Sequence, residues 1–149
     1  MYISWYAIFL GKQFVTFQCN AARSQSGIRN PDQHTYMIFD KTLGEKLVLM
    51  KTTGPQGRFN RAQRSHMNLL ETLPVYITGA MLSGYVVGPV AFGVSIVWFI
   101  GKNWMTFGYA NSNGGRLPGF ALSVFMEMIT SGLVLSIGVC ALANWTRLG

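Results

Sequence analysis

Acidic residues are scarce in this chain. Five Asp and Glu stand against twelve Lys and Arg among 149 residues. Only 11% of the residues are charged and 50% are hydrophobic, whereas a soluble domain carries roughly 25% charged residues, so an ordinary soluble globule is disfavoured. The net charge of +7 is compatible with nucleic acid, an anionic membrane surface or an anionic small ligand. Because the basic residues punctuate long apolar runs, we expect no nucleic-acid partner.

Cysteine is also scarce. The chain has two, Cys19 and Cys140, and each lies inside an apolar stretch. Two isolated cysteines support neither a disulfide framework nor a zinc site. We therefore expect both to be packing residues and predict no metal site.

Long apolar runs, by contrast, are abundant. Four stretches reach the roughly 20 residues that a helix needs to cross a bilayer. They are residues 2–22, 69–90, 91–110 and 118–145. The first lacks a basic start and a clear small-x-small cleavage site, so we interpret it as a true span and not a secretory signal. The predicted fold class is all-α, an integral-membrane four-helix bundle that forms a single domain over residues 1–149.

The connections between the spans define the predicted topology. An uncharged Gly/Pro turn at residues 83–89 joins the second and third spans as a tight antiparallel pair. Residues 111–118 join the third and fourth, with a Gly pair for the turn and Pro118 in the first turn of the next helix. The first and second spans are joined by a polar loop, about residues 23–58. This loop and the following residues up to Arg64 form one segment rich in Lys and Arg. The positive-inside rule places this segment, and the third connection, in the cytosol.

Within the polar loop, residues 35–39 and 46–50 are short apolar runs. They could rest on the bundle or on the membrane interface. We assign them no secondary structure from the sequence.

A polar stripe marks the start of the second helix, which we expect to extend back to about Phe59. Four of its polar side chains fall within about 80° of the helix circumference: Arg61, Arg64, Asn68 and Glu71. Charges at this depth are unfavourable in a membrane, so they should face a bundle interior or a cavity. One interpretation is an internal Arg64–Glu71 network that fixes helix packing. The other is a pocket for a zwitterionic peptide-like ligand, with Arg and Asn for carboxylates and Glu for an ammonium group.

A second polar cluster ends the third span. Tyr109 lies near the helix end, where an aromatic is most often an interfacial residue. Arg116 comes just before the fourth helix, and a cation beside a helix N-terminus makes a site for an anion. Both clusters lie on the basic side of the membrane, so they can converge. His66 points roughly opposite to Arg64, so it could reach the same type of ligand only in the pocket of a neighbouring subunit.

Together these residues resemble the MAPEG family, the membrane-associated proteins in eicosanoid and glutathione metabolism, and most closely its third microsomal glutathione S-transferase type. The match covers about two thirds of the chain, from Arg58 onward. The matching pieces are Phe59-Asn60, Gln63-Arg64-x-His66-x-Asn68-x-x-Glu71-x-x-Pro74, Gly108-Tyr109 and Arg116.

The resemblance implies a homotrimer that binds glutathione between adjacent subunits near the cytosolic face. The implied activity is glutathione transfer to lipophilic electrophiles, or glutathione-dependent reduction of lipid hydroperoxides, with glutathione as a co-substrate. The implied glutathione-binding residues are Arg64, Asn68, Glu71 and Tyr109 of one subunit, with His66 and Arg23 of its neighbour. Arg116 corresponds to the arginine that stabilises the thiolate. The implied location is the endoplasmic reticulum membrane, with mitochondrial and plastid membranes as alternatives.

The chain departs from the family pattern at three places. Met105 stands where the family often has a tyrosine, four residues before Tyr109. Arg23-Ser24 replaces the paired arginines or basic run of some members, which disfavours leukotriene-synthase chemistry. The first loop is also longer than expected. These departures leave an alternative, a non-catalytic MAPEG-fold subunit that binds or supports a larger membrane complex, although the intact polar stripe and Arg116 argue against it.

Two further ionisable residues, Lys12 and Glu127, lie within predicted spans. We carry neither over from the family. We expect Glu127 to pair with Lys12 or with Lys102 inside the bundle, as a structural pair and not as part of the chemistry.

Overall fold

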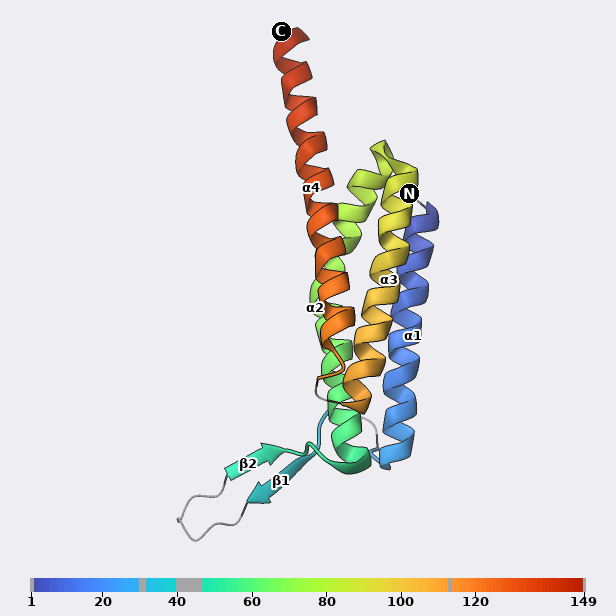
Figure 1. Cartoon of the computed structure of the whole chain (residues 1–149), viewed down its shortest axis with the longest axis vertical. Coiled ribbons are helices and arrows are strands. Elements are labelled where there is room, and N and C mark those ends of the chain that lie inside the picture. Colours follow the sequence, from blue (N-terminus) through green and yellow to red (C-terminus); the bar gives the residue numbers. More distant parts are fainter. Residues whose placement is uncertain (1, 30–31, 40–46, 113, 149) are drawn as a thin grey trace.

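The computed structural model of the chain is a bundle of four long helices with a two-stranded hairpin at one end (Figure 1). It describes residues 2–29, 32–39, 47–112 and 114–148, and the element counts refer to these residues. The helices are α1 (Tyr2–Ser26), α2 (Gly54–Val86), α3 (Gly88–Asn111) and α4 (Leu117–Leu148), and the strands are β1 (Tyr36–Phe39) and β2 (Leu47–Met50). The predicted four-helix architecture is confirmed.

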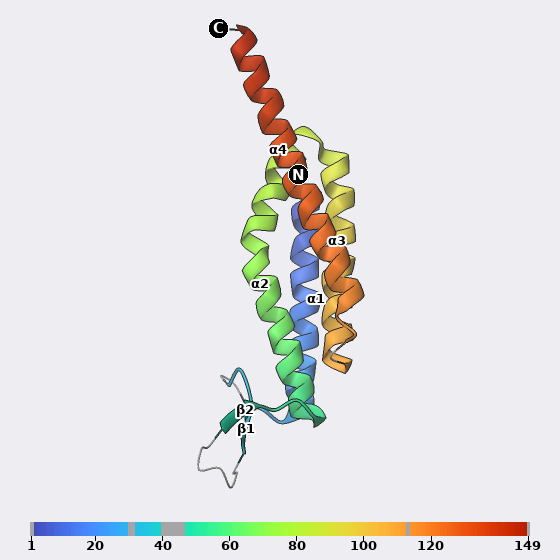
Figure 2. The ribbon, with the colours of Figure 1, turned by 60° about the vertical axis from the view of Figure 1, so that its left-hand side comes forward.

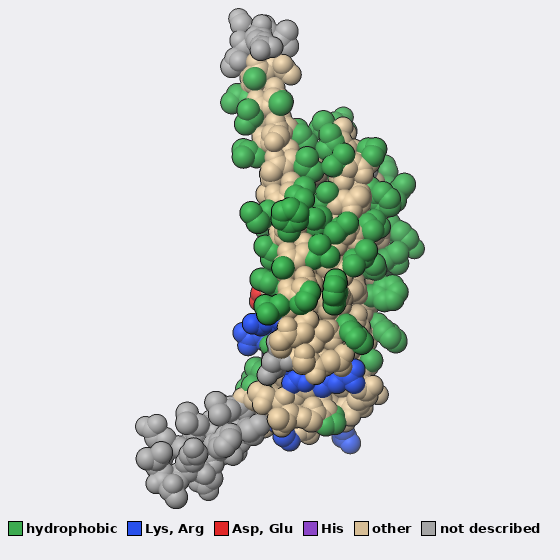
Figure 3. Space-filling view, in the orientation of Figure 1, with side chains coloured by type: hydrophobic (Ala, Val, Ile, Leu, Met, Phe, Trp, Pro, Cys, Tyr) green, Lys and Arg blue, Asp and Glu red, His purple; other side chains and the backbone are tan. Residues whose placement is uncertain are grey.

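The two ends of the bundle differ in chemistry. The hairpin and the connection between α3 and α4 lie at one end, and both termini and the turn between α2 and α3 lie toward the other (Figure 1). Lys and Arg side chains gather near the hairpin end, whereas hydrophobic side chains cover the helices above it (Figure 3). By length and composition, α3 and residues 117–144 of α4 can each cross a membrane. The arrangement matches the predicted topology, with one basic end and an apolar body.

The ends of the helices differ from the predicted bounds by up to five residues. Helix α1 continues past residue 22 to Ser26, and α4 begins one residue before the predicted start and ends three after the predicted end. Helix α2 begins at Gly54, before the predicted start near Phe59, because Pro55 occupies its first turn, where the missing N–H does no harm. The break between α2 and α3 lies at Val87 and not after Val90. Pro89 in the first turn of α3 fixes this break.

The hairpin comes from the two apolar runs that had no assignment. Strands β1 and β2 pair antiparallel, with Tyr36 opposite Met50; Lys46, at the start of the second run, lies outside the described residues. Asn60, buried on α2, holds the base of the hairpin. Its Oδ1 accepts from the Thr35 N–H at 2.9 Å, and its Nδ2 donates to the carbonyls of Thr35 and Lys51, each at 2.8 Å. The hairpin is therefore tied to the bundle beside the polar stripe.

Glycines bring α3 and α4 into close contact. A Cβ on Gly119 would overlap the backbone N of Met105, and a Cβ on Gly108 would overlap the carbonyl of Gly115. Small residues at these positions let the two backbones approach, as in many membrane helix pairs. The close approach holds the end of α3 against the start of α4, where Tyr109 and Arg116 lie.

The core lies among all four helices. Its buried members include Ile8 and Val15 of α1, and the Tyr76 and Trp98 rings stack at 4.1 Å between centroids. Cys19 is buried as predicted, but Cys140 is exposed, so its assignment as a packing residue was wrong. The reason is that the last part of α4 extends beyond the other three helices (Figure 2).

Candidate functional site

A cavity of about 490 Å³ lies beside the hairpin, between α2, α3 and the start of α4. Its walls are Arg64, Ser65, Met67, Asn68 and Glu71 of α2, Met105 and Tyr109 of α3, Arg116, Leu117 and Phe120 at the start of α4, His34 before the hairpin and Met50 at the end of β2. Five of the seven predicted site residues line it: Arg64, Asn68, Glu71, Tyr109 and Arg116. Residues from three helices thus converge, as the two predicted polar clusters required.

The α2 wall presents two ionic groups without partners. Arg64, Asn68 and Glu71 share one helix face because they are four and three residues apart. Behind them, Ser65 and Thr106 are hydrogen-bonded, with 2.8 Å between their hydroxyl oxygens, which fixes α2 against α3. In the described part of the chain, Arg64 and Glu71 form no ion pair with each other or with another residue. The predicted alternative of a closed Arg64–Glu71 network is therefore not formed, and both groups are available to a ligand.

Opposite this wall, Arg116 and Tyr109 form a second surface. The Arg116 guanidinium lies 5.1 Å from the centroid of the Tyr109 ring. The Arg116 carbonyl accepts the Phe120 N–H at 2.9 Å, so Arg116 stands at the N-terminal cap of α4. The guanidinium and the positive end of the helix dipole therefore lie together, and both favour an anion at this edge of the cavity.

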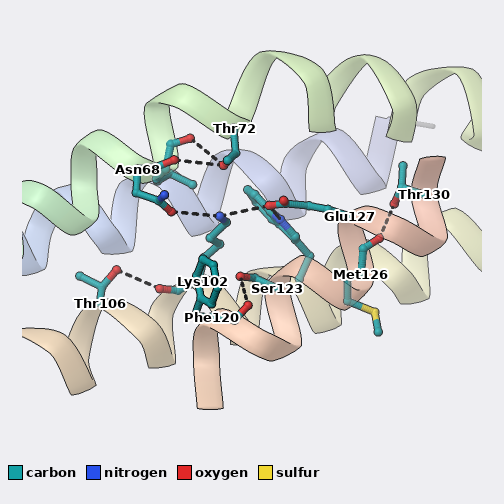
Figure 4. Close-up of polar contacts among 11 residues, drawn as sticks. Asn68, Thr72, Lys102, Thr106, Phe120, Ser123, Met126, Glu127 and Thr130 are labelled. Carbon is teal, nitrogen blue, oxygen red and sulfur yellow. Dashed lines mark hydrogen bonds and ion pairs between the residues drawn. The ribbon is translucent and has the colours of Figure 1, made fainter. Parts of the chain in front are cut away.

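Asn68 is held from behind by a buried lysine. Lys102 Nζ lies 3.4 Å from Asn68 Oδ1 and 3.1 Å from Glu127 Oε1 (Figure 4). This is the salt bridge that the described residues contain. Of the two predicted partners for Glu127, Lys102 is confirmed and Lys12 is not.

His66 and Arg23 do not line the cavity of their own chain. His66 Nε2 lies 3.2 Å from Thr16 Oγ1, on the side of α2 that packs against α1. Arg23 donates to the carbonyl of Asp32 at 2.6 Å, and its guanidinium lies 4.7 Å from the centroid of the Phe59 ring. Within one chain both side chains therefore bind α1 and the first loop to α2.

Arg61, the first member of the polar stripe, has a structural position. Its guanidinium donates to the carbonyls of Tyr109 at 2.9 Å and Ala110 at 3.0 Å. These carbonyls belong to the last turn of α3, which has no intrahelical donors for them. Arg61 therefore caps α3 and fixes Tyr109, but it does not face the cavity.

Sequence reasoning missed His34 and Met50. His34 precedes β1 and Met50 ends β2, and although Met50 belongs to the apolar run 46–50, no periodicity assigns either residue to a cavity. The residue that could have indicated the hairpin is Asn60, in the Phe59-Asn60 pair that resembles the family. A buried Asn side chain needs hydrogen-bond partners, which here are backbone groups. Here those partners are the two ends of the hairpin, which places His34 and Met50 at the cavity.

A groove continues from the cavity along α2 and α4. A cavity of about 310 Å³ shares Glu71 with the first, and the next, of about 620 Å³, shares Val75, Gly79 and Ser131 with it. A further cavity of about 520 Å³ follows the same helices away from the hairpin. We call this series the α2–α4 groove. It begins with polar side chains, including Glu127, and becomes apolar farther from the hairpin.

A comparison with protein families places the chain among known proteins. A family model described as the MAPEG family matches residues 3–136. The match includes all the predicted site residues and nearly all of the bundle. No curated protein matches the chain.

Proposed function

The chain belongs to the MAPEG family, a family of membrane four-helix bundles that use glutathione and include both enzymes and non-catalytic members. From this membership and the cavity, we propose that it is a glutathione transferase or glutathione-dependent peroxidase, most like the third microsomal type. The observation that carries the proposal is the convergence in one cavity of Arg64, Glu71 and Arg116, three ionic groups that form no ion pair with any residue the structure describes.

Glutathione has the charges that these groups require. It is a zwitterionic tripeptide with two carboxylates, one ammonium group and one thiol. Arg64 and Asn68 can bind carboxylate oxygens, and Glu71 can bind the ammonium group. Tyr109 borders the same space. With both ends of the tripeptide held along α2, its thiol would lie toward the second cation of the cavity, Arg116.

Arg116 is the proposed activator of the thiol. A free thiol has a pKa near 8.5 and is only a few per cent ionised at neutral pH. Lowering that pKa by about two units requires roughly 2.7 kcal/mol of preferential thiolate stabilisation. A guanidinium about 4 Å from the sulfur supplies roughly 4 kcal/mol at an effective dielectric of 20. The helix N-terminus adds to this field. Arg116 is therefore sufficient without a second activating group.

The α2–α4 groove supports a lipophilic second substrate. It opens from the cavity at Glu71 and runs along α2 and the part of α4 that is long and apolar enough to cross a membrane. An apolar electrophile or a lipid hydroperoxide can therefore enter laterally from the bilayer and reach the thiolate without crossing water. Conjugation and peroxide reduction begin with the same thiolate attack, so the proposal includes both reactions.

We also propose a homotrimer in the endoplasmic reticulum membrane. Arg64 and Glu71 are exposed in the single chain, which leaves one side of the cavity open. A neighbouring subunit would close it, and His66 and Arg23 are the residues that the family resemblance assigns to that role. Their contacts within their own chain lie on the opposite side of α2 from the cavity.

A non-catalytic role is the second candidate, and Met105 favours it. Met105 is buried in the cavity wall, with 5% of its surface exposed, where the family often has a tyrosine hydroxyl. Such a subunit would not ionise a thiol, whether or not it binds glutathione. The hairpin that extends from the bundle offers it a surface for a partner (Figure 1).

One experiment separates these candidates. Purified protein in mild detergent is titrated with glutathione at pH 7, and the thiolate is followed by its ultraviolet absorbance. S-methylglutathione, which has no thiol, is the matched control for binding alone. We expect saturable binding of both ligands and a thiolate signal with glutathione only. Binding without that signal favours the non-catalytic subunit, and failure of both ligands to bind contradicts the glutathione site.

A further inference from the structure

Lys102 is a buried ammonium group directly behind the cavity wall. Its side chain is 3% exposed, and it lies on α3 between α2 and α4. Figure 4 shows its amine between Asn68 and Glu127, at 3.4 Å from Asn68 Oδ1 and 3.1 Å from Glu127 Oε1. Trp98 Nε1 donates to the same Glu127 oxygen at 2.9 Å. The proposed thiol chemistry does not use Lys102 or Glu127.

The chemistry of lysine fixes the orientation of the Asn68 amide. An ammonium group only donates hydrogen bonds, so the Asn68 atom that faces it must be the carbonyl oxygen. The Asn68 NH₂ group is then turned away from Lys102. Because Asn68 also lines the cavity, its two N–H donors are presented to the ligand. Without Lys102, the amide could rotate and present its oxygen instead.

Glu127 keeps Lys102 in this position. An unpaired ammonium group in the membrane interior is unfavourable, so without a partner it would move toward water. The carboxylate of Glu127 neutralises it, and Trp98 holds that carboxylate. The three side chains come from two helices that are already fixed by close glycine contacts.

We propose that Lys102 and Glu127 are positioning residues that orient Asn68 as a hydrogen-bond donor, so that the cavity selects an acceptor oxygen at this point. This inference rests on the proposed function, in which the acceptor is a carboxylate or amide oxygen of glutathione. Lys102 touches neither the substrate nor the thiol. It acts through Asn68.

A double-mutant cycle tests the coupling. Lys102→Met should weaken glutathione binding roughly tenfold, the loss expected for one hydrogen bond to a charged group. Asn68→Ala should weaken it by a similar factor. If Lys102 acts through Asn68, adding Lys102→Met to Asn68→Ala should change the affinity less than twofold. Lys12→Met, which removes the other predicted in-span lysine from a different helix, is the matched control and should bind like wild type.

A second variant separates positioning from stability. Lys102→Met alone leaves a carboxylate unpaired, whereas Lys102→Met combined with Glu127→Gln removes both charges and keeps an acceptor for the Trp98 N–H. We expect this double variant to melt close to wild type while glutathione binding stays roughly tenfold weaker. In turnover, KM for glutathione should rise, and both kcat and the thiolate pKa should stay unchanged because Arg116 is intact.

The orientation of the amide can also be read without glutathione. In protein labelled with ¹⁵N-asparagine, the Asn68 side-chain resonances are identified by their loss in Asn68→Ala. They should shift in Lys102→Met and stay in place in Lys12→Met. If wild type binds no glutathione, the proposed function fails and these resonances alone decide the inference. Asn68 resonances that stay in place in Lys102→Met overturn the inference. Wild-type glutathione affinity in a folded Lys102→Met/Glu127→Gln variant also overturns it.

Discussion

Arg116→Ala tests the proposed chemistry most directly, because the change removes a charge with little effect on the fold. The Arg116 side chain is exposed, and its structural contact in the described chain is with the Tyr109 ring. The backbone carbonyl that accepts the Phe120 N–H remains in the alanine variant. We therefore expect normal assembly and glutathione affinity within a few-fold of wild type, because Arg64, Asn68 and Glu71 still hold the ends of the tripeptide.

The size of the rate change depends on pH. If Arg116 lowers the thiol pKa from about 8.5 to about 6.5, its loss reduces the ionised fraction at pH 7 about 25-fold. The more basic thiolate is a better nucleophile, and a Brønsted coefficient of about 0.45 restores about eightfold. The net loss at pH 7 is then only about threefold, whereas at pH 5.5 it is about elevenfold. The two pH profiles should cross near pH 7.6, above which the variant is about as fast or faster.

The assay is the rate of conjugation under conditions where thiolate attack limits turnover, measured from pH 5.5 to 9.5 beside the thiolate absorbance titration. Arg29→Ala, which removes another exposed arginine outside the cavity, is the matched control and should follow the wild-type profile. A wild-type thiol that titrates near 8.5 would refute the reasoning. A variant profile that superimposes on wild type would do the same, and the non-catalytic subunit would become the better account.

Three other outcomes are expected. Glu71→Gln should weaken glutathione binding by about tenfold with the fold intact, as measured by calorimetry; if the variant fails to assemble and its folded fraction binds normally, Glu71 is structural. Chemical cross-linking in mild detergent should end at a trimer, and a particle with the mass of one protomer would contradict the assignment of His66 to a neighbouring site. Gly119→Ala should lower the melting temperature, since overpacking costs about 1–3 kcal/mol, whereas Gly132→Ala, with nothing within 4 Å of its Cβ, should melt at or above wild type.

The bundle and the α2 wall of the cavity were predictable because both depend on helical periodicity. Long apolar runs indicated the four helices, of which α3 and α4 are apolar enough to cross a membrane. The spacing of Arg64, Asn68 and Glu71 placed these residues on one helix face before any packing was known. The same argument included Arg61, which the structure assigns to the carbonyls that end α3. Periodicity gives the face of a helix, but the neighbouring helix decides which members of that face meet a cavity.

The hairpin and its contribution to the site could not be predicted in this way. Two runs of four paired residues are too short for a reliable strand pattern, and Asn60 of α2 holds the hairpin through Thr35 and Lys51, which lie outside the strands. Hydrogen bonds between separate segments of this kind produce no periodic pattern in the sequence. Only the structure therefore identified His34 and Met50 as part of the cavity wall.

The partner of Glu127 lies between these two cases, because the sequence narrowed it to two lysines and the packing of the helices decided between them. Helices α3 and α4 are joined by a short turn, and Gly108 meets Gly115 while Gly101 meets Ser123. In such an antiparallel pair, Lys102 lies opposite about residue 122, so Glu127 is about five residues, roughly 7.5 Å, farther along α4. A lysine side chain spans most of that distance. Lys12 lies on α1, which packs on α2 and α3, and so it could not compete. The packing of the helices thus selects Lys102, and with it a cation behind Asn68.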